Sequence, residues 1–191
     1  MEKIRAGFAM CASFCTFSKA LTEMESLINQ NVDVTPIMSQ NAYSIDTRFG
    51  KADEFVERIE NLCGKKIIHT ITEAEPIGPK KLLDILIIEP CTGNTLGKLA
   101  NGITDTAVTL SAKSHLRNSR PLLLAVSTND ALASSAKNIG QLMNYKNIFF
   151  VPMAQDDCVN KPNSIVADFS KTYDAMTFAL AGKQLQPLYT K

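Results

Sequence analysis

The strongest constraint on the fold is an alternation of short apolar runs with helical patterns along the whole chain. Apolar runs predict strands at residues 4–10, 32–38, 82–88, 122–126 and 147–151. Helical patterns occupy residues 17–28, 51–62, 94–101, 106–118 and 165–180. Such alternation predicts a mostly parallel sheet covered on both faces. We therefore expect an α/β fold, a three-layer Rossmann-like (flavodoxin-like) sandwich, formed by residues 1–191 as a single domain.

Local signals refine this pattern. Pro36 argues against a fully central place for the second strand, because proline lacks the N–H that a central strand donates. The unbroken apolar character of residues 82–88 predicts burial on both faces. Gly64 predicts the end of a helix, and Asp130 is a candidate cap for the helix that follows it. Residues 76–80, PIGPK, predict a loop.

Composition excludes several classes of protein. Twenty Lys and Arg residues nearly balance 19 Asp and Glu residues, and a net charge of +1 does not favour nucleic-acid binding. No apolar run reaches the roughly 18 residues of a membrane helix, and residues 1–10 lack a long apolar secretory segment. Five irregularly spaced cysteines do not form a disulfide framework, and two histidines do not favour a zinc site. We expect a cytoplasmic enzyme or binding protein.

Small polar residues follow four of the predicted strands. The carboxyl ends of parallel strands line one rim, where α/β sheets bind ligands. Hydroxyl groups and free amides at helix starts suit a phosphate, so the rim is a predicted nucleotide site. The G-x-G-x-x-G fingerprint and the Walker A sequence are absent, which favours a mononucleotide such as FMN over NAD. The alternative is that these side chains only cap helices.

Residues 90–105, PCTGNTLGKLANGITD, form the most specific motif. They resemble the PATANT signature and following A-K-x-A-x-G-I-A-D helix of the flavoprotein superfamily, which includes the flavin-containing cysteine decarboxylases. Residues 121–130, PLLLAVSTND, resemble a second segment of that superfamily more loosely. The resemblance implies an FMN site and a homo-oligomer, often a trimer. Its predicted cofactor contacts are Ser13, Ser39, Thr92, Asn94, Thr95, Ser127 and Asn129.

Within this superfamily the chain is similar, over nearly its whole length, to the B-subunit family of dipicolinate synthases. The segments that carry this similarity include TRFG at 47–50, AEPIGPK at 74–80, STNDAL at 127–132, KNIFFVP at 146–152 and KPNS at 161–164. The resemblance implies oxidation of dihydrodipicolinate to pyridine-2,6-dicarboxylate during sporulation. It also implies a partner, the A subunit of dipicolinate synthase, that binds NAD(P) and is required for activity.

A dicarboxylate substrate requires cationic side chains. Arginine suits this task because its planar guanidinium binds a carboxylate through two hydrogen bonds. Arg48 and Arg117 are the predicted substrate-binding residues, and Arg120 is a further candidate. The alternative for each is a solvated surface charge.

One position departs from the wider superfamily. Its decarboxylases carry an active-site histidine about eight residues before the aspartate that opens the third strand. Counting back from Asp84 reaches Pro76, and neither His69 nor His115 fits, so no catalytic residue is assigned. Met10 and Cys11 also make the first loop bulkier than the superfamily pattern. The alternatives are a flavin-dependent decarboxylase, a flavin prenyltransferase of the same superfamily, or a non-catalytic flavin-binding partner subunit.

Overall fold

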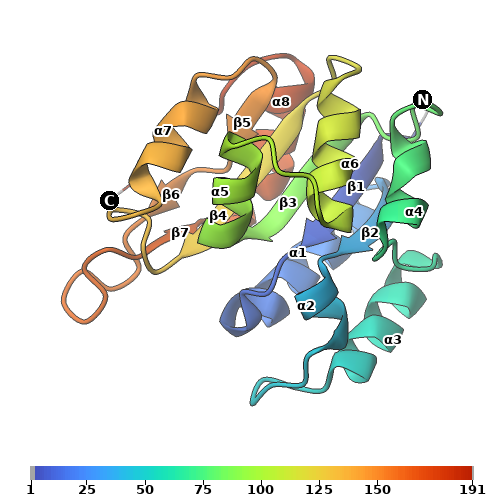
Figure 1. The fold of residues 1–191 in the computed structure, drawn as a ribbon, viewed down its shortest axis with the longest axis horizontal. Helices are drawn as coiled ribbons and strands as arrows, with labels where there is room; N and C mark the ends of the chain where they lie inside the picture. The colour runs from blue at the N-terminus through green and yellow to red at the C-terminus, as the bar shows by residue number, and fades with distance from the viewer. Residues whose placement is uncertain (1–2, 191) are drawn as a thin grey trace.

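The computed structural model describes residues 3–190, in which seven strands form one sheet (Figure 1). The strands are β1 (Arg5–Met10), β2 (Asp33–Met38), β3 (Ile85–Cys91), β4 (Leu122–Thr128), β5 (Ile148–Phe150), β6 (Met153–Ala154) and β7 (Ile165–Ala167). Strands β2, β1, β3, β4 and β5 pair in that order and run parallel. Strand β7 pairs antiparallel with the end of β4, and β6 pairs antiparallel with β7. The α/β fold with a mostly parallel sheet is confirmed.

Helices cover both faces of the sheet. On one face lie α5 (Gly93–Ala100), α6 (Ala107–Leu116) and α7 (Ala136–Met143), and on the other lie α1 (Phe17–Asn29) and α8 (Thr172–Leu180) (Figure 1). The remaining helices are α2 (Gln40–Ser44), α3 (Ala52–Cys63) and α4 (Ile71–Ala74), with short 3-10 turns η1 (Phe14–Thr16), η2 (Glu75–Ile77) and η3 (Phe169–Lys171). None of the helices formed within residues 3–190 is long and apolar enough to cross a membrane.

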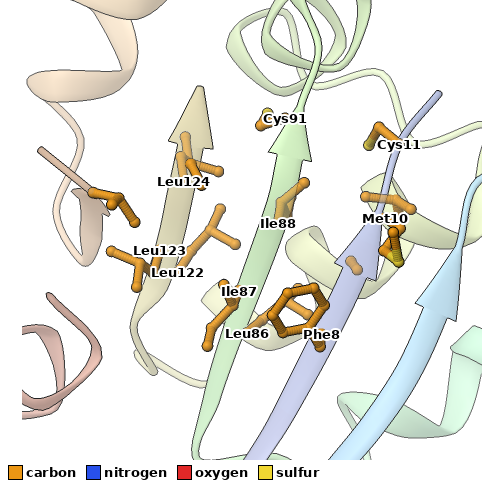
Figure 2. Packing of buried hydrophobic residues seen from close by; sticks show 14 of the residues in the cluster. Phe8, Met10, Cys11, Leu86, Ile87, Ile88, Cys91, Leu122, Leu123 and Leu124 are labelled. Atoms are coloured by element: carbon orange, nitrogen blue, oxygen red, sulfur yellow. The ribbon is translucent and has the colours of Figure 1, made fainter. Parts of the chain in front are cut away.

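The core lies between the central strands and these helices. Figure 2 shows Phe8 and Met10 of β1 beside Ile87 and Ile88 of β3, with Leu122–Leu124 of β4 next to them. All seven residues of β3 are buried, which confirms the predicted burial on both faces. This packing fixes the carboxyl ends of β1, β3 and β4 next to one another, at the edge where the predicted ligand loops begin.

Several local predictions are confirmed. Strand β2 is the outer strand of the parallel part of the sheet, so Pro36 occupies an edge position. Gly64 ends α3 with a φ of 63°, a left-handed conformation that glycine adopts without a steric penalty. Gly102, which follows α5, likewise has a positive φ of 68°.

Other predictions are wrong. The third strand is β3, three residues later than residues 82–88, because the Asp84 carboxylate binds Arg5 at the strand's start and Cys91 still pairs with Val126. Residues 165–167 form β7 rather than the start of the last helix, which begins at Thr172. Their β-branched Ile165 and Val166 pair with Thr128 and Ser127 instead.

The helix start and loop predictions also need correction. Asp130 does not cap α7, whose N-cap is Ser135 without a side-chain capping bond. Residues 76–80 are not a loop throughout, since η2 includes Pro76 and Ile77, and α4 lies directly before it. Thr70 and Glu73 form a reciprocal capping box at the start of α4, a local signal that the proline-rich sequence around it obscured.

Candidate functional site

The sheet order places the predicted loops at one rim. In the order β2-β1-β3-β4-β5 the chain winds in opposite directions on either side of the β1–β3 boundary. Parallel α/β sheets bind ligands at the carboxyl ends of the strands flanking such a boundary. Here those ends lead into residues 11–16 after β1 and residues 92–95 after β3. The candidate site is therefore built around these two loops.

Three hydroxyl groups form a cluster between the first loop and the end of β4. Ser13 Oγ lies 3.0 Å from Ser127 Oγ, and Thr16 Oγ1 lies 3.2 Å from Ser13 Oγ and 3.4 Å from Ser127 Oγ. The Thr16 hydroxyl also donates to the Ser13 carbonyl oxygen at 2.8 Å. Ser127 is buried, and its hydroxyl holds the first loop against the end of β4.

The motif loop is ordered by its own threonines. Thr92 is the N-cap of α5, and its hydroxyl accepts from the Thr95 backbone N–H at 3.4 Å. The Thr95 hydroxyl donates to Cys11 Sγ at 3.1 Å, which links the third loop to the first. The Ser39 hydroxyl caps α2, and the Ser39 backbone N–H donates to the Met10 carbonyl oxygen at 3.0 Å. The loops after β1, β2, β3 and β4 are thus joined at one rim.

Asn94 and Asn129 present the exposed amides of this rim. Both side chains are exposed, and neither makes a hydrogen bond within residues 3–190. Asn94 is in the first turn of α5 and Asn129 directly follows β4. Their amides therefore have donors and acceptors that no group within residues 3–190 uses.

Two buried thiols, Cys11 and Cys91, lie at this edge, and a third, Cys15, is exposed in the first loop. Burial raises the pKa of Cys11 to about 11, despite the opposing hydrogen bond from Thr95. Burial also raises the pKa of Cys91 well above its usual value. Both thiols therefore stay protonated near neutral pH, which argues against either as a nucleophile. Met10 and Cys11 are buried in the core, so their bulk does not obstruct the rim (Figure 2).

The arginines lie in different places. Arg48 is exposed between α2 and α3, with its guanidinium carbon 4.9 Å from the centre of the Phe49 ring. Arg117 ends α6 just before β4 begins, so it lies at the amino edge, about 20 Å along the sheet from the rim. Arg120 is also at the amino edge, where its guanidinium binds the Leu83 carbonyl oxygen and the Asp84 carboxylate. Arg120 is a structural residue.

The histidines also occupy separate environments. His115 is buried in α6, where its Nε2 donates to the Pro121 carbonyl oxygen at 2.9 Å. Burial lowers the pKa of His115 to about 4. His69 stacks on Tyr43 with ring centres 3.8 Å apart and lies 3.2 Å from the Glu73 carboxylate. Pro76 lies in η2, and no histidine takes its place in the described part of the chain.

Two acidic groups lie near the rim: Asp130, which the sequence suggested only as a helix cap, and Glu89, which it did not single out. Asp130 accepts hydrogen bonds from three hydroxyl groups and lies against Gly93 of the motif loop. Glu89 is completely buried one residue before Pro90, and it accepts from the Thr172 hydroxyl at 2.6 Å. A glutamate within the apolar run of β3 was the signal that could have revealed Glu89. Within residues 3–190, no group of three or more His, Cys, Asp or Glu side chains is arranged to hold a metal ion.

The profile of the Flavoprotein family matches residues 1–175. The chain belongs to the flavoprotein family. It is 45% identical over 184 residues to the B subunit of dipicolinate synthase from Bacillus subtilis, an alignment that covers 96% of this chain and 92% of that protein. This flavoprotein is therefore a member of the family of dipicolinate synthase B subunits, as its sequence motifs predicted.

Solved structures of other flavoproteins agree with this fold. The crystal structure of the dipicolinate synthase B subunit from Bacillus halodurans superposes with a TM-score of 0.91 at 38% identity, covering 100% of this chain and 99% of that one. The FMN-dependent cysteine decarboxylase SpaF superposes with a TM-score of 0.67 at 20% identity, over 93% of this chain and 95% of that one. The likeness to SpaF concerns the fold alone.

Proposed function

We propose that this flavoprotein acts as the B subunit of a dipicolinate synthase during sporulation. The proposed reaction oxidises dihydrodipicolinate to pyridine-2,6-dicarboxylate, and the hydride passes to NAD(P) bound by the A subunit. The observation that carries the proposal is the 45% identity to the Bacillus subtilis B subunit over 96% of the chain. Loss of a hydride to NAD(P) and of a proton to solvent makes the ring aromatic, so the protein contributes mainly by positioning the substrate and binding its two carboxylates.

The proposed cofactor site is an FMN pocket at the rim. The fit is supported by the exposed amides of Asn94 and Asn129 and by the hydroxyl cluster of Ser13, Thr16 and Ser127. The start of α5 adds backbone N–H groups that suit a polar ligand. Ser39, Thr92 and Thr95 would support these contacts by fixing the loops. A bound flavin would supply a group that can accept a hydride.

Arg48 is the proposed substrate-binding arginine of this rim. It lies beyond α2, which follows β2 at the carboxyl edge, and its guanidinium is exposed. A guanidinium there can bind a substrate carboxylate through two parallel hydrogen bonds. Arg117 lies at the opposite edge, so a contact between Arg117 and the same substrate would have to come from another copy of the chain. A homo-oligomer, with a trimer as the first candidate, is part of the proposal.

The second candidate function is a decarboxylase or prenyltransferase on the same fold. The fold of FMN-dependent cysteine decarboxylases such as SpaF, and of a UbiX protein crystallised with FMN and dimethylallyl pyrophosphate, favours it. Pro76 argues against the decarboxylase, because the superfamily's active-site histidine would stand there. A flavin-binding subunit without catalytic residues of its own is the third candidate.

A two-part experiment separates these functions. The purified chain is first examined for a flavin spectrum, alone and after incubation with FMN. It is then mixed with the A subunit, dihydrodipicolinate and NADP, and the formation of pyridine-2,6-dicarboxylate is followed by absorbance. Product formed only when both polypeptides are present supports the proposal. Full activity of the A subunit without this chain would contradict it, and release of carbon dioxide from a cysteine-ended peptide would favour the decarboxylase.

A further inference from the structure

Asp130 is the centre of a compact hydrogen-bonded cluster after β4. Its Oδ1 accepts from the Thr128 hydroxyl at 2.5 Å and from the Ser135 hydroxyl at 2.9 Å. Its Oδ2 accepts from the Ser134 hydroxyl at 2.5 Å. These hydroxyl donors lower the pKa of Asp130, led by Ser134 and Thr128, so the carboxylate is charged at neutral pH. The side chain is therefore held rigidly, although it caps no helix.

This cluster lies directly against the first residue of α5. A methyl group added to Gly93 would come within 2.7 Å of Asp130 Oδ1, 2.7 Å of Ser135 Oγ and 2.8 Å of Thr128 Oγ1. The conformation of Gly93 is helical and has no positive φ, so the glycine is needed for this close approach and not for its backbone freedom. The superfamily pattern has alanine here, and this chain has room only for glycine.

The contact has a consequence for the start of α5. Thr92, Asn94 and Thr95 surround Gly93, so a surface that fixes Gly93 also fixes their positions. The Asp130 carboxylate also brings a negative charge close to the positive end of the α5 helix dipole, which stabilises a helix. The first turn of α5, with the sequence GNTL, contains no acidic residue of its own.

We propose that Asp130 is the positioning residue of the motif loop. Through the hydroxyls of Thr128, Ser134 and Ser135 it forms a rigid wall that Gly93 contacts, and this wall holds Thr92, Asn94 and Thr95 in their binding conformation. The consequence for ligand binding rests on the proposed flavin site, whereas the effect on loop order does not.

Hydrogen exchange in the ligand-free full chain tests the positioning directly. The Thr95 and Leu96 amides are bonded to Thr92 Oγ1 and the Thr92 carbonyl oxygen, so they report on the order of the loop. In Asp130→Asn we expect their exchange to become about tenfold faster, the effect of losing one charge-assisted hydrogen bond. The Ile87 amide in the centre of β3 reports global unfolding, which loss of a native hydrogen bond also favours, so its exchange should accelerate by at most the same factor.

The controls keep the experiment decisive. Thr128→Val removes one hydroxyl with little change of shape and should speed the same two amides, whereas Thr128→Ser should restore wild-type exchange. Asp157→Asn changes another carboxylate with several hydrogen bonds, to Val159 and Asn160, and should leave the Thr95 and Leu96 amides unchanged. Wild-type exchange at both amides in Asp130→Asn and Thr128→Val would overturn the proposal.

FMN titration supplies the second readout. Asp130→Asn is expected to raise the dissociation constant for FMN about tenfold, with a melting temperature close to that of Asp157→Asn. Failure of the wild-type chain to bind FMN would count against the flavin pocket alone, because the exchange experiment still decides the role of Asp130. Wild-type FMN affinity in Asp130→Asn, together with faster exchange, would overturn the link from loop order to binding.

Discussion

The hydroxyl oxygens of Ser13 and Ser127 lie 3.0 Å apart, although 114 positions separate the two residues in the sequence. Ser13 follows β1 and Ser127 is near the end of β4, and β3 lies between these two strands. The hydrogen bond therefore crosses the end of β3, where the motif loop begins. It joins the first and fourth loops across the same edge that the proposed flavin would occupy.

Removing the Ser127 hydroxyl should weaken FMN binding. Ser127→Ala takes away one member of the hydroxyl cluster and leaves Ser13 and Thr16 with one partner fewer. A hydrogen bond of this kind contributes about 1 kcal/mol, so the dissociation constant for FMN should rise about fivefold. Fluorescence titration with FMN measures this dissociation constant.

The matched control is Ser26→Ala, which removes a hydroxyl that accepts only from Gln30 on the exposed side of α1. If Ser26→Ala and Ser127→Ala bind FMN equally well, the hydroxyl cluster is not part of the cofactor site. A Ser13→Ala, Ser127→Ala double variant that loses no more than either single variant would show that the two hydroxyls act as one unit.

Replacing Arg48 should weaken substrate binding in the two-subunit assay. A bidentate contact between a guanidinium and a carboxylate contributes about 1.5–3 kcal/mol, so Arg48→Ala should raise the KM for dihydrodipicolinate about tenfold or more. FMN affinity should stay at the wild-type value. Arg58→Ala is the matched control, because Arg58 is also exposed, lies on α3 and has no assigned role in substrate binding. Equal KM values for Arg48→Ala and Arg58→Ala would contradict the assignment, and a KM increase for Arg117→Ala alone would move the assignment to Arg117.

The sequence was sufficient for the fold and the rim, because both depend on local patterns. Apolar runs and helical spacing predict the parallel strands, and small polar residues after four of them predict the loops of the rim. The hairpin of β6 and β7 was missed because two-residue and three-residue strands give almost no periodicity. The contact of Asp130 with Gly93 was missed because it joins residues 37 positions apart, and spacing suggested only a local helix cap.

Glu89 should make the stability of this protein fall as the pH rises. Burial raises the pKa of the Glu89 carboxyl well above its usual value, and the Thr172 hydroxyl is the single partner it has within residues 3–190. A raised pKa in the folded state means that the unfolded chain releases a proton first. The Glu89 contribution is therefore intact below about pH 4.5 and is lost as the pH rises toward the folded-state pKa.

Replacing Glu89 with glutamine removes this dependence. Above about pH 4.5, and until the pH reaches the folded-state pKa of Glu89, the free energy of unfolding of the wild type relative to Glu89→Gln should fall with a limiting slope of about 1.4 kcal/mol per pH unit. Urea unfolding at several pH values measures the difference. Glu57→Gln, which changes an exposed glutamate on α3, is the control and should follow the wild type. Parallel pH profiles for the wild type and Glu89→Gln would show that Glu89 is ionised in the folded protein.

His115 should have the opposite effect on the acid side. Burial lowers its pKa to about 4, so the folded protein holds the imidazole neutral while the unfolded chain takes up a proton near pH 6.5. The contribution of His115 is therefore intact above pH 6.5 and is lost as the pH falls toward 4, by about 3 kcal/mol in total. His115→Gln keeps an N–H group that can donate to the Pro121 carbonyl oxygen but cannot be protonated in this range. As the pH falls from 6.5 to 4, the free energy of unfolding of His115→Gln should rise relative to that of the wild type. An equal decrease of the free energy of unfolding in both proteins would show that His115 is accessible to protons in the folded state.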